Sequence, residues 1–374
     1  MIQIRPFTLA VPQAQLDDLG TRIDLTRWPE KECVDDWSQG TPLAAVQDLL
    51  EYWRGGYDWR RCEAQLNGLA QFITEIDGLD IHFIHRRSSR ADALPLIITH
   101  GWPGSVVEFL GVIDALAEPE DGGLAFHVVA PSLPGFGFSG KPAATGWGVE
   151  KIAQAWAQLM QRLGYSRWVA QGGDWGSAVT TAIGVQQPEG CLGIHLNMPI
   201  GRPAPEDLAA PSPPEVKALT ALKHYQDWDS GYSTQQRTRP QTVGYGLVDS
   251  PAGLAGWILE KMWAWTDNQG SPYDALSRDQ ILDNLMLYWL PATGASSARL
   301  YWESFGSFAP RAISLPVAVS AFPKEILPTP RKWAERNFSN LVHWGDMENG
   351  GHFAAWEQPE AFVRELRTAF ALMA

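Results

Sequence analysis

The sequence of 374 residues contains few cysteines, and their number and spacing exclude two kinds of site. Cys33, Cys62 and Cys191 are too few and too far apart for a disulfide framework or a cysteine-based metal motif. We therefore expect reduced, buried thiols, as in proteins of the cytoplasm.

Long apolar runs are also missing. No stretch approaches the roughly 18 consecutive apolar residues of a transmembrane helix. The first residues, MIQIRPFTLAVPQAQ, lack the apolar segment of a signal peptide. These absences predict a cytoplasmic protein without a membrane anchor.

Positive charge is scarce: 29 Lys and Arg stand against 42 Asp and Glu, for a net charge of -13. Such a balance disfavours binding to nucleic acid or to an anionic membrane surface. The 45% of hydrophobic residues indicates a large core, and the 18 tryptophans are many for this length. Because large aromatic rings also line apolar pockets, we expect a small apolar partner.

Short apolar runs alternate with helical patterns in the middle of the chain. LPLIITHG (94–101), AFHVVAPS (125–132), RWVAQGG (167–173) and CLGIHLNM (191–198) are typical of strands buried on both faces of a parallel sheet. Helices are expected over 106–119 and 149–164, and QFITEIDGLDIHFIHRR reads as a hairpin turning at Asp77-Gly78. The alternation predicts an α/β fold.

Six prolines interrupt this pattern between residues 199 and 214. Strand patterns resume at 315–322 and 341–344, and a helix over 359–373 closes the chain. We therefore predict an α/β core of residues 71–200 and 306–374, with a helical lid of residues 201–305 over the ligand-binding ends of the strands. Residues 1–70 read as a helical segment packed on the core.

The stretch AQGGDWGSAVT (170–180) has the spacing of a nucleophile elbow, in which small residues flank a central nucleophile. Most such elbows place serine at the centre, whereas this one places Asp174 there. The glycines permit the tight turn because a Cβ beside the nucleophile would clash. The competing interpretation is an ordinary turn in which Asp174 caps a helix.

A second motif, ITHGWPGS, follows the first long parallel strand. In elbow-bearing folds this loop and the residue after the nucleophile supply the two backbone N–H groups of an oxyanion hole. Those donors would be the N–H groups of Trp102 and Trp175 here.

The stretch NGGHFAAWEQPE places His352 after the last strand, where the order nucleophile, acid, histidine puts the base. His343 is a distant alternative. The acid partner is expected to be Glu325, which lies beyond a strand end in SAFPKE, and Asp346 is the competitor.

A carboxylate nucleophile is ionised without help and attacks carbon to give an alkyl ester, which leaves the histidine to activate water. The leaving group is then a halide or the oxygen of an epoxide. An epoxide oxygen needs an acid, and tyrosine suits that role. The candidates in the lid are Tyr225, Tyr232, Tyr245, Tyr273, Tyr288 and Tyr301.

Together, HGWPGS, PSLPGFGFS, GGDWGS, GYSTQQRTRPQTVGYGLVDSPAGLAGWILEK, SAFPKE and GGHFAAWE resemble the epoxide hydrolases of the microsomal type, a group that includes the juvenile-hormone epoxide hydrolases. The resemblance covers nearly the whole chain. It implies an α/β-hydrolase fold, with a mostly parallel sheet flanked by helices, a helical lid and an N-terminal wrapping segment.

The resemblance also implies roles for individual residues. Asp174 would be the nucleophile, His352 the base and Glu325 its acid partner. Tyr232, in SGYSTQ, and Tyr301, in ARLYWESFG, would polarise the epoxide oxygen. Eukaryotic members carry an N-terminal membrane anchor, and this sequence departs from them there.

The leading hypothesis is thus an epoxide hydrolase that needs no cofactor or metal and converts an apolar epoxide to a vicinal diol, in detoxification or aromatic hydrocarbon catabolism. A haloalkane dehalogenase, with the Trp175 indole holding halide, is the alternative enzyme. A non-catalytic binding protein for a small hydrophobic ligand is the alternative from another class. The oligomeric state, a homo-oligomer included, stays open.

Overall fold

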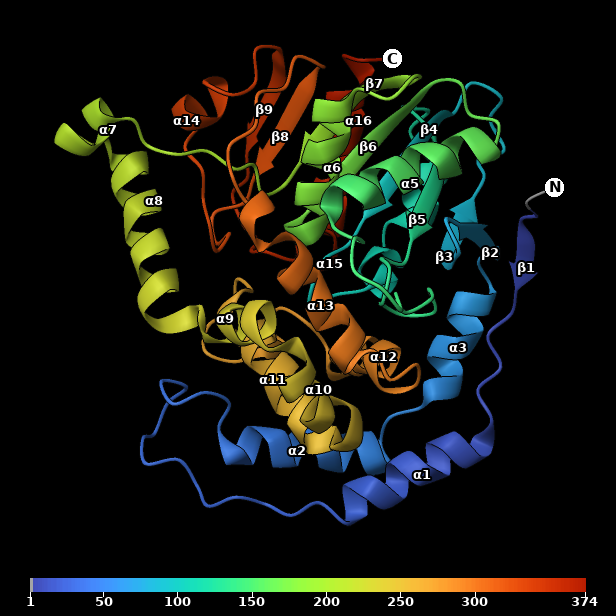
Figure 1. Cartoon of the computed structure of the whole chain (residues 1–374), viewed down its shortest axis with the longest axis vertical. Helices are drawn as coiled ribbons and strands as arrows, with labels where there is room; N and C mark the ends of the chain where they lie inside the picture. Colours follow the sequence, from blue (N-terminus) through green and yellow to red (C-terminus); the bar gives the residue numbers. More distant parts are fainter. Residues whose placement is uncertain (1–2) are drawn as a thin grey trace.

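A nine-stranded sheet forms the centre of the computed structural model, which describes residues 3–374 (Figure 1). The strand order is β1-β2-β3-β5-β4-β6-β7-β8-β9, and all pairings from β5 to β9 are parallel. The mostly parallel sheet of an α/β-hydrolase fold is confirmed. The strands are β1 Arg5–Phe7, β2 Gln71–Ile76, β3 Leu79–Arg86, β4 Leu94–Thr99, β5 Phe126–Pro131, β6 Trp168–Gly172, β7 Cys191–Leu196, β8 Val317–Ala321 and β9 Leu341–Asp346.

The parallel strands have the apolar sequences expected of buried strands. Every residue of β6 is buried, and β4 and β7 each leave only one residue partly accessible. Helices cover both faces of the sheet, as Figure 1 shows for α5, α6 and α16. The helices of the core are α4 Ile113–Ala117, α5 Val149–Arg162, α6 Asp174–Gln186, α14 Arg331–Glu335, α15 Ala354–Glu357 and α16 Pro359–Ala371.

Two local predictions are wrong, and one strand was not predicted. The helix expected over 106–119 is instead a short 3-10 turn, η1 (Val106–Phe109), followed by α4, because Gly111 between them does not support a continuous helix. Strand β1 was not expected, since its three residues carry no alternating pattern and it exists only by pairing with β2. Cys33 is exposed rather than buried, whereas Cys62 and Cys191 are buried.

The helices of the predicted N-terminal segment pack largely against the predicted lid. These helices are α1 Gln13–Asp24, α2 Leu43–Gly55 and α3 Trp59–Asn67. Helices α1 and α2 contact α11, and α3 contacts α12; Figure 1 shows α1 and α2 below the lower ends of α10 and α11. The Arg61 guanidinium lies 2.6 Å from the Asp283 carboxylate, which also accepts a hydrogen bond from the Tyr57 hydroxyl at 2.7 Å.

The predicted lid, residues 201–305, consists of helices and short turns. Proline occupies the start of α7, α8, α10 and α11, where its missing N–H is not needed. Among residues 3–374, no helix combines the length and the apolar character needed to span a bilayer. The elements are α7 Pro205–Ala209, α8 Pro213–His224, η2 Tyr225–Asp229, α9 Gly231–Thr238, α10 Pro240–Asp249, α11 Pro251–Ala264, η3 Pro272–Asp274, α12 Arg278–Trp289, α13 Gly294–Ser304 and η4 Phe305–Ser307.

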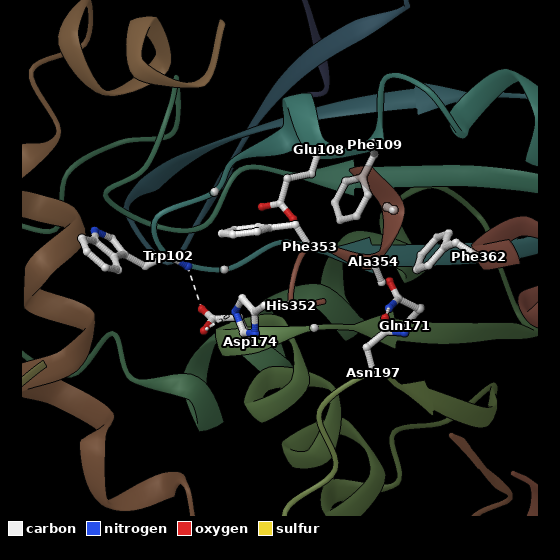
Figure 2. Close-up of a pocket in the computed structure, with 14 residues that line it drawn as sticks. Trp102, Glu108, Phe109, Gln171, Asp174, Asn197, His352, Phe353, Ala354 and Phe362 are labelled. Atoms are coloured by element: carbon white, nitrogen blue, oxygen red, sulfur yellow. Dashed lines mark hydrogen bonds and ion pairs between the residues drawn. The ribbon is translucent and has the colours of Figure 1, made fainter. Parts of the chain in front are cut away.

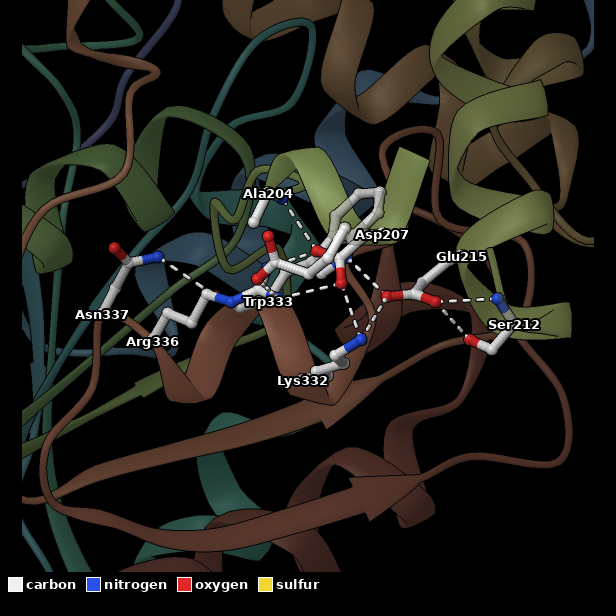
Figure 3. Close-up of polar contacts among 9 residues, drawn as sticks. Ala204, Asp207, Ser212, Glu215, Lys332, Trp333, Arg336 and Asn337 are labelled. Atoms are coloured by element: carbon white, nitrogen blue, oxygen red, sulfur yellow. Dashed lines mark hydrogen bonds and ion pairs between the residues drawn. The ribbon is translucent and has the colours of Figure 1, made fainter. Parts of the chain in front are cut away.

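An ion-pair cluster fixes the first helices of the lid to α14 of the core (Figure 3). The buried Asp207 carboxylate contacts Lys332 at 2.6 Å and Arg336 at 2.5 and 2.9 Å. The buried Glu215 carboxylate lies 3.3 Å from Lys332 and accepts a hydrogen bond from the Trp333 indole at 3.1 Å. Because both carboxylates are fully paired, the start of the lid has a fixed position on the core.

Candidate active site

The elbow after β6 holds Asp174 in a strained backbone conformation. Asp174 has a φ of 50°, in the left-handed region that few residues other than glycine adopt. A Cβ on Gly172 would lie 2.0 Å from the Gly176 carbonyl oxygen, and a Cβ on Gly176 would lie 1.9 Å from the Thr99 carbonyl oxygen. The N-cap position of α6 belongs to Gly173, so the Asp174 carboxylate is not a helix cap.

His352 lies between two carboxylates. Its Nε2 atom is 3.2 Å from Asp174 Oδ2, and its Nδ1 atom is 2.8 Å from Glu325 Oε1. Figure 2 shows the Asp174 and His352 side chains directed toward each other. The alternatives lie elsewhere: Asp346 is at the exposed end of β9, and His343 pairs with Glu365 at 2.8 Å. The structure thus brings together Asp174, His352 and Glu325.

The charges around His352 decide its protonation state. Burial alone would lower the pKa of His352, but the Glu325 and Asp174 carboxylates together raise it well above its usual value. The two carboxylates therefore favour the protonated form of the His352 imidazole. Within residues 3–374, no group of three or more His, Cys, Asp or Glu side chains is arranged to hold a metal ion.

The Trp102 backbone N–H donates a 2.7 Å hydrogen bond to Asp174 Oδ1. Such close contact requires Gly101 beside it, since a Cβ there would lie 2.0 Å from the same oxygen. If the carbonyl carbon of an Asp174 ester is attacked, the oxyanion forms on an Asp174 oxygen, so this donor is already in place. No hydrogen bond joins the Trp175 backbone N–H to Asp174 among the described residues, and its role as second donor stays a prediction.

Two lid tyrosines lie over this loop. Tyr232, from α9, stacks on the Trp102 ring with centroids 4.9 Å apart, and Tyr301, from α13, meets the same ring edge-on at 5.8 Å. Their own ring centroids are 5.7 Å apart. Burial raises the pKa of both phenols well above the usual value, with the Asp174 charge contributing in each case. Both therefore retain their protons and can donate hydrogen bonds.

The other candidate tyrosines have different surroundings. The Tyr225 hydroxyl lies 3.3 Å from the Tyr232 hydroxyl, at the margin of the site. Tyr288 donates to the Gly104 carbonyl at 2.8 Å, and Tyr245 is exposed. The structure thus brings Tyr232 and Tyr301 to the Trp102 loop, and Tyr225 supports Tyr232.

A buried lysine packs against Tyr232. Lys261 Nζ lies 4.6 Å from the centroid of the Tyr232 ring and 2.8 Å from Asp229 Oδ1. The Trp265 indole N–H donates to Asp229 Oδ2 at 2.7 Å, and the Trp265 ring meets Tyr232 edge-on. This polar cluster fixes the ring of Tyr232 from the side of the lid.

Residues of the lid also hold the loop that carries His352. The four consecutive backbone N–H groups of residues 350–353 bond, in chain order, to Asp267 Oδ2, Glu357 Oε2, the Trp265 carbonyl oxygen and Glu357 Oε1, at 3.0, 3.0, 2.9 and 2.9 Å. Sequence reasoning missed Asp267 and Glu357. Glu357 is part of the motif GGHFAAWE, but its partners are main-chain N–H groups, which every residue except proline has. No spacing of side chains in the sequence could therefore have indicated this role.

Two families match the chain. Residues 4–109 match the family described as the epoxide hydrolase N terminus, and residues 95–246 match the alpha/beta hydrolase fold. The two matches together include the N-terminal helices, the elbow and the first part of the lid.

Relatives extend this match over the whole chain. A protein of Stigmatella aurantiaca, provisionally named an epoxide hydrolase, is 56% identical over 98% of this chain and 84% of its own length. Epoxide hydrolase 1 of Sus scrofa is 34% identical over 99% of this chain and 89% of its own length.

Solved structures give the same result. The juvenile hormone epoxide hydrolase of Bombyx mori superposes with a TM-score of 0.93 at 31% identity, over all of this chain and 95% of the other. The Aspergillus niger epoxide hydrolase superposes with a TM-score of 0.90 at 34% identity, over all of this chain and 97% of the other. The chain therefore belongs to the epoxide hydrolases of the microsomal type, and it is an enzyme that hydrolyses epoxides.

Proposed function

We propose that this epoxide hydrolase works through a covalent alkyl ester on Asp174. The observation that carries the proposal is the position of the Asp174 carboxylate, between the Trp102 N–H and the His352 imidazole. In the first step an Asp174 oxygen bonds to one epoxide carbon while the bond from that carbon to the epoxide oxygen breaks. Tyr232 and Tyr301 hydrogen-bond to that oxygen, and one of them gives it a proton.

The second step hydrolyses the ester. His352 takes a proton from water, and the water oxygen bonds to the Asp174 carbonyl carbon. The Trp102 N–H stabilises the resulting oxyanion, and the Trp175 N–H is the second donor. The bond from that carbon to the alkyl oxygen then breaks, and His352 returns the proton to this oxygen. The product is a vicinal diol.

The proton balance fits the electrostatics of His352. Esterification removes the negative charge of Asp174, one of the causes that raise the pKa of His352. His352 then loses its proton, which restores the tyrosine, and becomes the neutral base that the second step needs. After hydrolysis, the second proton of the water returns to His352 and restores the ion pair with Asp174.

The surroundings favour an apolar epoxide. The rings of Trp102, Tyr232 and Tyr301 contact one another, and Tyr301 also contacts Trp175. Phe308 packs on Trp175 with ring centroids 4.5 Å apart. We place the enzyme in the cytoplasm, acting on such epoxides in detoxification or catabolism. The family membership leaves a haloalkane dehalogenase and a non-catalytic binding protein without support.

A single turnover of styrene oxide in oxygen-18 water tests the covalent intermediate. The label is expected in Asp174 after one turnover, found by mass analysis of the peptide that contains it. A label that enters the diol and never enters Asp174 would exclude the ester.

Two variants separate the steps. His352→Ala is expected to trap a protein heavier by one substrate molecule. Tyr232→Phe combined with Tyr301→Phe is expected to form no adduct, whereas Tyr245→Phe, at an exposed position, behaves as the wild type. Adduct formation at the wild-type rate in the double variant would end the acid role of the two tyrosines.

A further inference from the structure

A small cavity adjoins the Asp174–His352 pair on the side away from the Trp102 indole (Figure 2). In that view the indole points to one side of the pair, while Gln171 and Asn197 lie on the other side. The volume open to the centre of a water molecule is about 20 Å³, and roughly 10–15 Å³ suffices for one water. The cavity therefore fits a single water beside the nucleophile.

Two buried polar atoms around this cavity, Gln171 Oε1 and Asn197 Nδ2, have no hydrogen-bond partner among the described residues. His352 Nε2, which also borders the cavity, has the Asp174 Oδ2 atom at 3.2 Å as its ion-pair partner. Gln171 is 1% exposed and Asn197 4% exposed. The Gln171 side-chain N–H donates to Asn197 Oδ1 at 2.6 Å, which fixes the orientation of both amides and leaves their other polar atoms free. Buried polar groups in proteins are usually satisfied, commonly by an ordered water.

Glu108, from the 3-10 turn η1, also lines the cavity. Its side chain keeps some accessible area although its carboxyl is enclosed by protein, as expected for a group that faces a cavity. The carboxyl lies over Gly104, where a Cβ would come within 1.5 Å of Glu108 Oε1. Burial raises the pKa of Glu108 to about 8, against the opposing charge of His352. The carboxyl is therefore mostly neutral at pH 7 and adds no second negative charge beside Asp174.

We propose that this cavity binds the water that hydrolyses the Asp174 ester, and that Glu108 is a positioning residue for that water. The inference rests on the covalent mechanism proposed above. It divides the site into two sides: the epoxide oxygen meets the tyrosines on the side of the Trp102 ring, and water waits on the side of Glu108 and Asn197.

The hydrogen-bonding capacity of one water matches this lining. One hydrogen must point to His352 Nε2, which removes it, and one lone pair must point to the Asp174 carbonyl carbon. The second hydrogen then needs an acceptor, which the C=O oxygen of the Glu108 side-chain carboxyl supplies. The second lone pair needs a donor, which the side-chain N–H of Asn197 supplies. A water held in this way is oriented before the ester forms.

The test compares the two chemical steps in three variants. Tryptophan fluorescence and mass analysis of quenched samples give the rates of alkylation by styrene oxide and of ester hydrolysis. For Glu108→Leu we expect alkylation within about twofold of the wild type and hydrolysis slower by about 100-fold, the scale of a lost orienting contact, so that the alkyl-enzyme accumulates. Glu108→Gln keeps the carbonyl acceptor and should recover hydrolysis to within about tenfold of the wild type.

Gly104→Ala keeps Glu108 but displaces its carboxyl. Like Glu108→Leu, it should therefore slow ester hydrolysis more than alkylation. Glu120→Leu, at an exposed position, is the matched control and should change neither rate. The inference is overturned if Glu108→Leu hydrolyses the ester at the wild-type rate or if both steps fall equally. If neither Glu108→Leu nor His352→Ala forms any alkyl-enzyme while the wild type produces diol, the covalent mechanism itself is overturned, so the two failures are distinguishable.

Discussion

At the scale of single residues, the proposed mechanism gives His352 a cationic and a neutral role in the same cycle. The Glu325 carboxylate contacts Nδ1 throughout, whereas the Asp174 charge near Nε2 disappears when the ester forms. Glu325 thus fixes the orientation of the His352 ring, but its charge also raises the pKa of His352, so that a higher pH is needed to make the ring neutral. The pH dependence of ester hydrolysis should report this compromise directly.

Replacing Glu325 by Gln should move the acidic limb of the hydrolysis rate to lower pH. The amide oxygen can still accept from Nδ1–H, but the negative charge that raises the pKa of His352 is gone. A histidine with a lower pKa becomes neutral, and so able to act as a base, at a lower pH. Because an adjacent opposite charge typically shifts a pKa by about 1–3 units, we expect the acidic limb to move by a similar amount. The hydrolysis rate of the alkyl-enzyme measured between about pH 5 and 9, the range in which histidine titrates, gives the limb.

Asp346→Asn is the control for this experiment, because the Asp346 carboxylate is exposed and hydrogen-bonds only to the Trp344 indole among the described residues. Its limb should coincide with that of the wild type. A shift of the Glu325→Gln limb to higher pH would contradict the assigned role of Glu325.

The sequence contained a clear signal for some of these residues and none for others. Asp174, His352 and Glu325 follow strand ends in a fixed order, because parallel strands present their carboxyl ends at one edge of the sheet. Glu108 lies in a stretch whose pattern predicts a continuous helix over 106–119, so its direction into a cavity depends on the 3-10 turn that replaces the start of that helix. Asp267 meets the His352 loop only through long-range packing.

At the scale of elements, the strand–elbow–helix unit allows no extra atom between β6 and α6. The Cβ positions at Gly172 and Gly176 are occupied by backbone, which cannot move as a side chain can. The elbow glycines therefore serve the fold as much as the nucleophile. Gly246, in α10, has no such constraint.

Alanine at Gly176 and at Gly246 should have opposite effects on stability. Gly176→Ala places a Cβ 1.9 Å from the Thr99 carbonyl oxygen and should cost about 3 kcal/mol or more, in the upper range for single substitutions. Gly246→Ala, in the middle of α10 with no atom within 4 Å of the new Cβ, should stabilise by about 0.5–1 kcal/mol. Urea unfolding measures both, and a stable Gly176→Ala variant would show that the elbow can relax.

The strands of the core were predictable as elements because they are short, apolar and separated by turn residues. The element between β4 and β5 was not, since 106–119 carries a helical pattern with Gly111 at its centre. Whether that pattern forms one helix or a 3-10 turn followed by the short helix α4 depends on the burial of Val106, Val107 and Phe109, which no local window contains.

At the scale of the whole molecule, the N-terminal helices cover the lid rather than the sheet alone. Asp283, 5% exposed, joins Arg61 and Tyr57 across more than 220 positions of sequence. This pairing could not be predicted from the sequence, because charged residues on the polar face of an amphipathic helix are usually exposed to solvent and nothing in the sequence marks these as paired. The contact joins two parts of the chain, the N-terminal segment and the lid.

Breaking this contact should loosen the N-terminal layer. Asp283→Ala leaves the Tyr57 hydroxyl and the Arg61 guanidinium without their acceptor and should cost about 2 kcal/mol, less than a fully buried pair because Arg61 is partly exposed. The exposed pair of Arg278 and Asp48 is the matched control, and Asp48→Ala should cost less than about 1 kcal/mol.

Urea unfolding and hydrogen exchange of residues 43–67 measure the loss in Asp283→Ala. Faster exchange in these residues with an unchanged β6 is the expected pattern. Equal costs for Asp283→Ala and Asp48→Ala would mean that the N-terminal layer does not depend on the buried carboxylate.

The bonds between residues 350–353 and the lid have a consequence for the exchange of substrate preference between relatives. Asp267 and the Trp265 carbonyl belong to the same segment as Tyr232, so the segment that carries the proposed acid also fixes the main chain of the proposed base. A graft of residues 201–305 onto another member therefore transplants half of the support of its histidine. Such chimeras can retain turnover only where the histidine loop of the recipient places its backbone N–H groups opposite the acceptors of the grafted lid. The lid and the histidine loop should therefore be exchanged together.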